Sequence, residues 1–230
     1  MTDLSNLESK LNLPFQNKEL LQQAFVHRSY LNENRDFHLA HNERLEFLGD
    51  AVLELIVTEY LYQKYPDKPE GELTAWRAAL VNTKMLSIVG RDVGFNDYLM
   101  LSRGEAKEEG KARDYILANT VEAFIGALYL DQGLPNAAKF ITLNILSRLA
   151  EVLKEQLFLD AKSRFQELAQ EKTGITPTYS VIQEWGPDHA KNFKMGVYLE
   201  KDLMAEGEGS SKQEAEESAA KNALREKGWK

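Results

Sequence analysis

The chain has 230 residues, of which 43% are hydrophobic, and a net charge of −8. This length suffices for one large domain or two modest ones, and the apolar content suffices for packed cores. The absence of cysteine excludes disulfides and thiolate zinc sites, and the four histidines do not have zinc-ligand spacing. Any metal site would therefore consist mainly of oxygen ligands.

The N-terminus has no basic stretch followed by an apolar run, and no segment approaches the roughly 20 apolar residues that cross a bilayer. We therefore expect a cytoplasmic protein with no membrane partner. The negative charge argues against nucleic acid, because phosphate binding normally needs a basic surface. Neither half is basic, since residues 1–159 carry −6 and residues 160–230 carry −2. Binding to nucleic acid would require a segregated basic face.

Helical patterns fill the first two thirds of the chain. Apolar residues recur there at three- and four-residue spacing, with Gly or Pro at the breaks. The clearest such segments are Asn17–His27, Asn42–Lys64, Lys84–Val93, Arg113–Leu130 and Asn136–Leu153. We predict an all-α domain over residues 1–154. The stretch Arg103–Arg113 mixes Lys and Arg with Glu and two glycines, and we interpret it as a mobile, solvated loop.

The last third has a different pattern. The short alternating stretches PTYSVIQEW, FKMGVYLE and DLMAEGEG indicate strands. Helical patterns precede them at Asp160–Lys172 and follow them at Lys212–Glu226. The prediction is an α+β multidomain chain, in which a linker at 155–160 joins the helical domain to an α-β-β-β-α domain at 161–230.

The segment HNERLEFLGDAVL places three carboxylates on one helix face. At about 100° per residue, Glu43, Glu46 and Asp50 fall within an arc of roughly 60°, opposite the apolar side chains. Like charges so close are destabilising unless a cation neutralises them, and their oxygen ligands suit Mg²⁺ or Mn²⁺. A solvated acidic face would explain the spacing equally well.

A second helical segment, ILANTVEAFIGALYL, is apolar enough to be buried. Asn119 and Glu122 are almost its only groups with metal-ligating oxygens. Burying a carboxylate costs several kcal/mol unless it is paired or bound to a metal. Glu122 therefore needs a partner, and an Arg or a backbone donor is the alternative to a metal ion.

The motifs carry a family resemblance. The run NERLEFLGDAVL closely resembles the signature of ribonuclease III, and ILANTVEAFIGALYLDQG resembles the second catalytic helix of that family. Between them, EGELT at residues 70–74 resembles the family's EGxLT/S turn. The resemblance covers nearly the whole chain in order. It implies a magnesium-dependent endonuclease that cuts double-stranded RNA in rRNA and mRNA processing, leaving 5′-phosphate and 3′-hydroxyl ends.

The resemblance also implies roles for individual residues. The metal-ligand set by position is Glu46, Asp50, Asn119 and Glu122, with Asp50 and Glu122 as the catalytic pair. Glu43 and Glu70 match two further acidic positions that line the same cleft. The best-known members have Asp in place of Asn119, which removes one negative charge here, although an amide oxygen can still bind Mg²⁺. No histidine is expected as a general base, because a bound metal ion can activate water.

Phe47 follows Glu46 on the acidic helix, where buried packing would be the ordinary expectation. In the family this aromatic is a knob that inserts into a socket of the other subunit. The resemblance therefore implies a homodimer with two cutting centres, one for each RNA strand, and short 3′ overhangs. A twofold arrangement also matches the approximate dyad of a duplex.

The segment GEGSSKQEAE begins the last helix, with Ser211 as the expected N-cap. A helix N-terminus with a Lys suits phosphate, although a plain capped helix is the alternative. The order α-β-β-β-α and this motif resemble the double-stranded-RNA-binding domain. The RNA-contacting positions that it implies are Ser163, Gln166, Glu167, His189, Lys191, Ser211 and Lys212. Much of this contact is polar and shape-based, which answers the charge objection.

Apolar residues of the second domain are expected in its core, because double-stranded RNA offers no exposed base faces. They are Phe165, Tyr179, Val181, Phe193, Val197, Ala219 and Leu224. Two other functions compete with the nuclease. A non-cleaving structural protein of the same fold that binds double-stranded RNA would be expected to lose the acidic residues. A phosphohydrolase of small molecules would not need the second domain.

Overall fold

The computed structural model describes residues 4–158, 161–187 and 191–229. The chain forms two compact units, Met1–Phe158 and Leu159–Lys230, each with its own hydrophobic core. The division falls inside the segment expected as a linker. Phe158 belongs to the first unit because its ring meets that of Trp76 with 6.1 Å between centroids.

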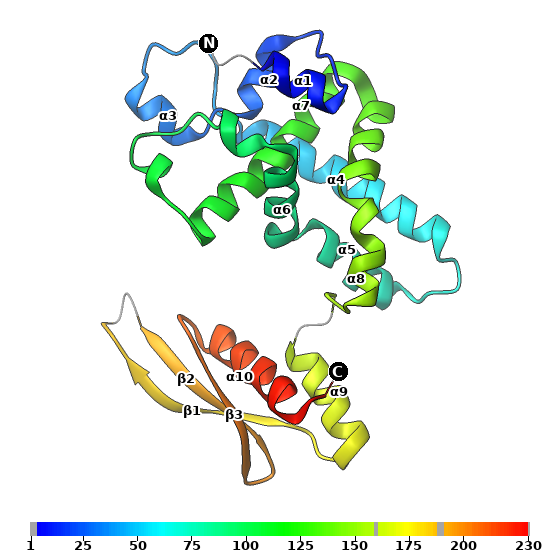
Figure 1. Ribbon diagram of the computed structural model, residues 1–230, viewed down its shortest axis with the longest axis vertical. Coiled ribbons are helices and arrows are strands. Elements are labelled where there is room, and N and C mark those ends of the chain that lie inside the picture. The colour runs from blue at the N-terminus through cyan, green and yellow to red at the C-terminus, as the bar shows by residue number, and fades with distance from the viewer. Residues whose placement is uncertain (1–3, 159–160, 188–190, 230) are drawn as a thin grey trace. The chain divides into compact units, whose positions relative to one another are not determined.

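The first unit is helical (Figure 1). Its described α-helices are α1 (Ser5–Leu11), α2 (Lys18–Ala24), α3 (Arg28–Glu33), α4 (Glu43–Lys64), α5 (Glu70–Val81), α6 (Thr83–Val93), α7 (Lys111–Asn144) and α8 (Leu149–Lys154). Short 3₁₀ turns lie at Phe95–Tyr98, Glu105–Lys107 and Leu146–Arg148. The predicted all-α domain is confirmed, and no helix among the described residues is both long and apolar enough to cross a membrane.

Three details differ from the sequence-based expectations. The break expected between Arg113–Leu130 and Asn136–Leu153 is present as a kink in α7 at Gly133 with φ of 77°, but the second helical segment ends at Asn144 and the rest of the expected helix is a 3₁₀ turn followed by α8. Glycine adopts this left-handed conformation without steric cost. The EGELT segment is the first turn of α5 and not a separate turn. The stretch interpreted as a solvated loop contains a 3₁₀ turn, and the Arg113 guanidinium donates hydrogen bonds to the carbonyls beside it.

Helices α4 and α7 form the centre of the first unit and cross at two glycines. A Cβ on Gly49 would lie 1.7 Å from the backbone oxygen of Glu122, and one on Gly126 would lie 2.2 Å from that of Leu45. Real side chains do not approach so closely, so only glycine permits this crossing. The crossing sets the part of α7 that carries Glu122 directly against the acidic turns of α4.

The second unit contains α9 (Ala161–Thr173), β1 (Thr178–Trp185), β2 (Asn192–Leu199), β3 (Asp202–Gly209) and α10 (Lys212–Lys227). The strands form an antiparallel sheet in the order β1-β2-β3, and α9 and α10 cover one face of it (Figure 1). This confirms the predicted α-β-β-β-α domain. Close packing of β3 on α10 depends on Gly207, where a Cβ would lie 2.1 Å from the backbone nitrogen of Ala219.

Most of the expected core of this unit is confirmed. Phe165, Val197 and Ala219 are buried, and Tyr179 and Leu224 pack against them. The placement of Val181 in the core is wrong, because this side chain is 39% exposed. Val181 pairs with Met195 in regular register, but β1 is an edge strand whose side chains are exposed along nearly all of its length. Phe193 is half-buried.

The crossing of α4 and α7 gives a first prediction. Gly126→Ala should lower the free energy of unfolding by about 3 kcal/mol, because its methyl group would overlap the Leu45 carbonyl. Chemical denaturation followed by circular dichroism measures this change. Gly71→Ala is the matched control, since a Cβ at Gly71 in α5 would meet nothing within 4 Å. Equal stability of the two variants would contradict the tight crossing.

Candidate active site and RNA-binding surface

Four polar side chains meet beside the helix crossing. Glu46 and Asp50 are one turn apart on α4, and Asn119 and Glu122 are one turn apart on α7. Glu46, Asn119 and Glu122 are half-buried, whereas Asp50 is exposed. Among the described residues, no basic side chain forms an ion pair with Glu46, Asp50 or Glu122. The alternative in which an Arg neutralises Glu122 is therefore excluded within that part of the chain.

The pKa values show how strongly these carboxylates oppose one another. Burial, together with the smaller effects of Asp50, Glu46 and Glu54, raises the pKa of Glu122 from 4.5 to about 8. Burial also raises the pKa of Glu46, as does Glu43, while a hydrogen bond with the Asn119 side chain lowers it. At neutral pH, Glu122 holds a proton unless a cation is bound nearby. A nearby positive charge would therefore stabilise the cluster.

The donor chemistry fits a hard divalent cation. Carboxylate and amide oxygens are the ligands that Mg²⁺ and Mn²⁺ prefer. Within residues 4–158, 161–187 and 191–229, no three His, Cys, Asp or Glu side chains already converge closely enough to hold a metal ion.

Glu43 lies at the edge of this cluster, in a cleft of about 350 Å³. Its carboxylate is 3.4 Å from Arg28 Nη1 and 3.7 Å from His41 Nδ1. Glu43 thus has a basic partner in Arg28, which distinguishes it from Glu46, Asp50 and Glu122. The residues that line the cleft are His27, Arg28, Asn42, Glu43, Glu46, Tyr115, Ile116 and Asn119.

The sequence alone did not single out Arg28 or Tyr115 as cleft residues. Tyr115 is exposed and precedes Asn119 by one turn of α7, and this spacing in the sequence could have placed it on the same helix face as Asn119. His27 lies in the same cleft, where its Nδ1 accepts a hydrogen bond from the Ser29 backbone N–H at 3.3 Å. Burial lowers its pKa, against an opposing effect of Glu105 and Glu43. His27 thus caps α3, and this cap gives no indication of a general base.

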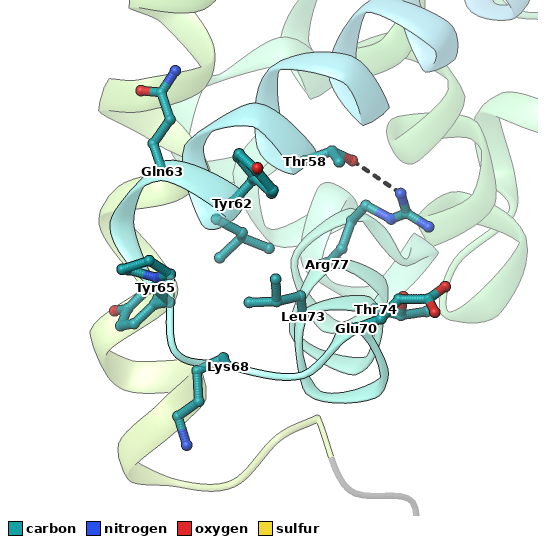
Figure 2. Close-up of a pocket in the computed structure, with 11 residues that line it drawn as sticks. Thr58, Tyr62, Gln63, Tyr65, Lys68, Glu70, Leu73, Thr74 and Arg77 are labelled. Atoms are coloured by element: carbon teal, nitrogen blue, oxygen red, sulfur yellow. Dashed lines mark hydrogen bonds between the residues drawn. The ribbon is translucent and has the colours of Figure 1, made fainter.

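Glu70 does not join the cluster within one chain. It lies at the start of α5 and lines a separate pocket with Thr58, Tyr62 and Arg77, as Figure 2 shows. Thr58 is roughly 22 Å from Glu43 along α4, at about 1.5 Å per residue. The expectation that Glu43 and Glu70 line the same cleft is therefore not met by the single chain.

In the second unit, α9 and the start of α10 border one hollow. Ser163 and Gln166 of α9 line it together with Ser211, the residue before α10. Ser211 Oγ accepts a hydrogen bond from the Glu214 backbone N–H at 3.1 Å, which confirms the predicted N-cap. Glu167 is exposed on α9 and does not line the hollow.

The remaining predicted RNA contacts lie around Glu184 of β1 or outside the described residues. Lys191 and Lys212 both form ion pairs with Glu184 of β1, at 3.9 and 3.6 Å. His189 lies outside the described residues. The structure therefore shows two of the predicted phosphate-binding lysines gathered around one carboxylate.

Comparison with known proteins decides the family. Residues 17–149, more than half of the chain, match the family described as Ribonuclease-III-like. The chain belongs to the ribonuclease III family. Residues 161–227 match the double-stranded RNA binding motif. A ribonuclease III domain followed by this motif supports an endoribonuclease that acts on double-stranded RNA.

Relatives extend the ribonuclease III assignment over the full length. The chain is 44% identical over 218 residues to Ribonuclease 3 of Streptococcus equi subsp. zooepidemicus, covering 95% of this chain and 94% of that protein. It is 44% identical over 222 residues to Ribonuclease 3 of Oceanobacillus iheyensis, covering 96% and 97%. The nuclease domain of Campylobacter jejuni ribonuclease III is 37% identical, with a TM-score of 0.57 over 63% of this chain and 97% of that domain.

The raised pKa of Glu122 gives a second prediction, for protein in EDTA. Between pH 4.5 and about 8 the folded state keeps a proton on Glu122 that the unfolded state has lost, so stability falls as pH rises through this window. Glu122→Gln removes this loss. The variant should therefore gain stability over the parent from pH 5 to 8, measured by chemical denaturation at each pH. Parallel pH profiles for the two proteins would contradict the raised pKa.

Proposed function

We propose that this protein is a magnesium-dependent endoribonuclease that hydrolyses phosphodiester bonds of double-stranded RNA. The observation that carries the proposal is the cluster of carboxylates without ion-pair partners, Glu46, Asp50 and Glu122, in the same chain as a double-stranded RNA binding motif. The same proposal places the protein in the cytoplasm, where it would act in rRNA and mRNA processing. Mn²⁺ is a possible substitute for Mg²⁺, because it accepts the same oxygen ligands.

Glu46, Asp50, Asn119 and Glu122 would hold the ion. When bound, Mg²⁺ supplies polarisation of the scissile phosphate and a lowered pKa of bound water, so no side-chain nucleophile is needed. Asp50 and Glu122 are the proposed catalytic pair. Attack by water with departure of the 3′ oxygen leaves 5′-phosphate and 3′-hydroxyl ends. Asn119 keeps Glu46 oriented by its hydrogen bond and contributes a neutral ligand where a carboxylate would add repulsion.

The non-cleaving alternative explains the site less well. Grouped carboxylates cost stability, as the raised pKa of Glu122 shows, and a protein that only binds RNA gains nothing from them. A binding protein of this fold would be expected to replace at least one of them by a neutral or apolar side chain. Here the three carboxylates remain.

We further propose a homodimer formed through α4. Three large apolar side chains on one side of this helix are exposed: Phe47 at 81%, Leu55 at 56% and Tyr62 at 73%. An apolar stripe of this kind marks an interface. Phe47 and Tyr62 lie at nearly equal distances on either side of Leu55. A twofold axis beside Leu55 would therefore set Phe47 of one protomer against the Tyr62 region of its partner.

A pocket lies beside Tyr62, at the position where this arrangement would place Phe47 of the partner subunit. The pocket in Figure 2 has a volume of about 620 Å³ and includes Tyr62, Leu61 and Leu73. Arg77 closes one side, held by Glu54 at 2.8 Å and by Thr58 at 2.9 Å. The volume and apolar residues suit an aromatic ring, which supports Phe47 as the knob.

This dimer would also account for Glu70. Because Glu70 lines the socket and Phe47 is next to Glu46, insertion of Phe47 would bring Glu70 of the partner subunit toward the acidic cluster. Each cutting centre would then receive its Glu43 from one protomer and its Glu70 from the other. Two such centres, one for each RNA strand, would produce short 3′ overhangs.

Cleavage is tested with a long, perfectly paired RNA duplex, with and without Mg²⁺. The parent should cut only with Mg²⁺, and a 5′-monophosphate-dependent exonuclease should degrade the products. Glu122→Gln should reduce cleavage by about a hundredfold or more and leave RNA binding nearly unchanged, because it removes a ligand charge but keeps the shape. Glu59→Gln, on the exposed side of α4, is the control. Binding without any cleavage by the parent would favour the structural alternative.

Assembly is tested by sedimentation over a dilution series. Phe47→Ala should raise the dimer dissociation constant by about tenfold or more, because large aromatic side chains at interface centres dominate binding energy. Leu143→Ala provides the control, since Leu143 of α7 is 63% exposed and lies off the α4 stripe. The knob role fails if Phe47→Ala and Leu143→Ala dissociate at the same concentration as the parent.

A further inference from the structure

One carboxylate in the second unit is shared by two lysines from different segments. Glu184, near the end of β1, lies with Oε1 3.6 Å from Lys212 Nζ and with Oε2 3.9 Å from Lys191 Nζ. Lys191 precedes β2, and Lys212 is the first residue of α10. All three side chains are partly exposed, so the group is accessible from solvent.

The position of Lys212 is not explained by helix stability. A lysine in the first turn opposes the helix dipole, whose positive end lies at the N-terminus. The ammonium group also lies 5.6 Å from the centre of the Phe193 ring, which holds it beside β2. Two ammonium groups, one of them carried by the first residue of a 16-residue helix, thus lie beside one carboxylate. This is an anion-binding arrangement, and the anion in it is the protein's own Glu184.

A carboxylate resembles the anionic part of a phosphodiester. Each presents two oxygens that share one negative charge, and each can accept hydrogen bonds from two ammonium groups at once. We propose that Glu184 occupies, in the free protein, the place of an RNA phosphate between Lys191 and Lys212, and that duplex RNA must displace it. This inference rests on the proposed binding of double-stranded RNA.

The energies of these interactions indicate that RNA can displace Glu184 from the two lysines, but that the displacement costs binding free energy. Exposed ion pairs contribute little, so a polyanion with its own condensed counterions can outcompete one carboxylate. Glu184 nevertheless remains near the displaced site and repels the incoming phosphate. The net effect is a lower affinity for RNA. Glu184 therefore limits how tightly the second unit holds a duplex.

The test measures binding of the full chain to an end-labelled perfect RNA duplex in EDTA, so that no cleavage occurs. Glu184→Gln keeps the shape and removes the charge. It should tighten binding about three- to tenfold at moderate salt, as expected for release from two exposed ion pairs. The slope of log affinity against log salt should also steepen by about 0.9, corresponding to one additional net positive charge at the phosphates.

Glu206→Gln is the matched control. Glu206 pairs with Lys194 at 2.5 Å, and side chains alternate along β2, so Lys194 points away from the helices that cover Val197. The control changes the net charge by the same amount on the other face of the sheet. The affinity of the Glu206→Gln protein for the duplex should stay within about twofold of that of the parent.

A double-mutant cycle isolates the shared site. Lys212→Gln should cost more affinity in the Glu184→Gln background than in the parent, because Glu184 no longer neutralises Lys212 there. The inference is overturned if Glu184→Gln binds equally or more weakly, if Glu206→Gln tightens binding as much, or if the two substitutions are additive. None of these outcomes would contradict duplex binding by the parent protein. A parent that binds no duplex would overturn the proposed function itself.

Discussion

The close crossing of α4 and α7 determines where the acidic residues lie. Gly49 and Gly126 let the two backbones touch, and the residue whose carbonyl faces Gly49 is Glu122. The same contact that fixes the centre of the helical core therefore places the Glu122 carboxylate beside Glu46 and Asp50. Packing energy from the surrounding apolar residues holds together groups that repel one another. The free energy gained by packing the core exceeds the cost of bringing the carboxylates together, and the site can therefore form.

Much of this site could be predicted from the sequence because helical periodicity is a local property. The spacing of Glu46 and Asp50 fixes their common face on α4, and an apolar α7 requires Glu122 to be buried. The position of Glu70 could not be predicted in this way. It depends on how α5 folds back on α4, and in one chain this places Glu70 beside Thr58 and Tyr62. The kink in α7, by contrast, lies at Gly133, where the glycine marked the expected break between two helices.

In the second unit, alternation predicted the sheet but not every side chain. Val181 lies at the surface because β1 is an edge strand that is exposed along nearly all of its length, and an apolar alternation does not show which strand lies at an edge. The net charge of this unit was a misleading indicator of nucleic acid binding, because it does not show where individual charges lie. The lysines of this acidic unit lie beside carboxylates, as Lys162 does with Glu216 at 2.5 Å and Lys194 with Glu206. Such pairs reduce the positive charge that these lysines present to a partner.

The environment of Glu122 has an evolutionary consequence. A half-buried carboxylate among other carboxylates lowers the stability of the fold, so a neutral side chain of the same shape in place of Glu122 favours folding. Selection for stability alone would remove the acid, while selection for activity keeps it. A lineage that no longer needed cleavage would thus drift quickly toward a neutral residue here and keep its architecture. Non-cleaving descendants of such a nuclease require no new fold, only relaxed selection at this one position.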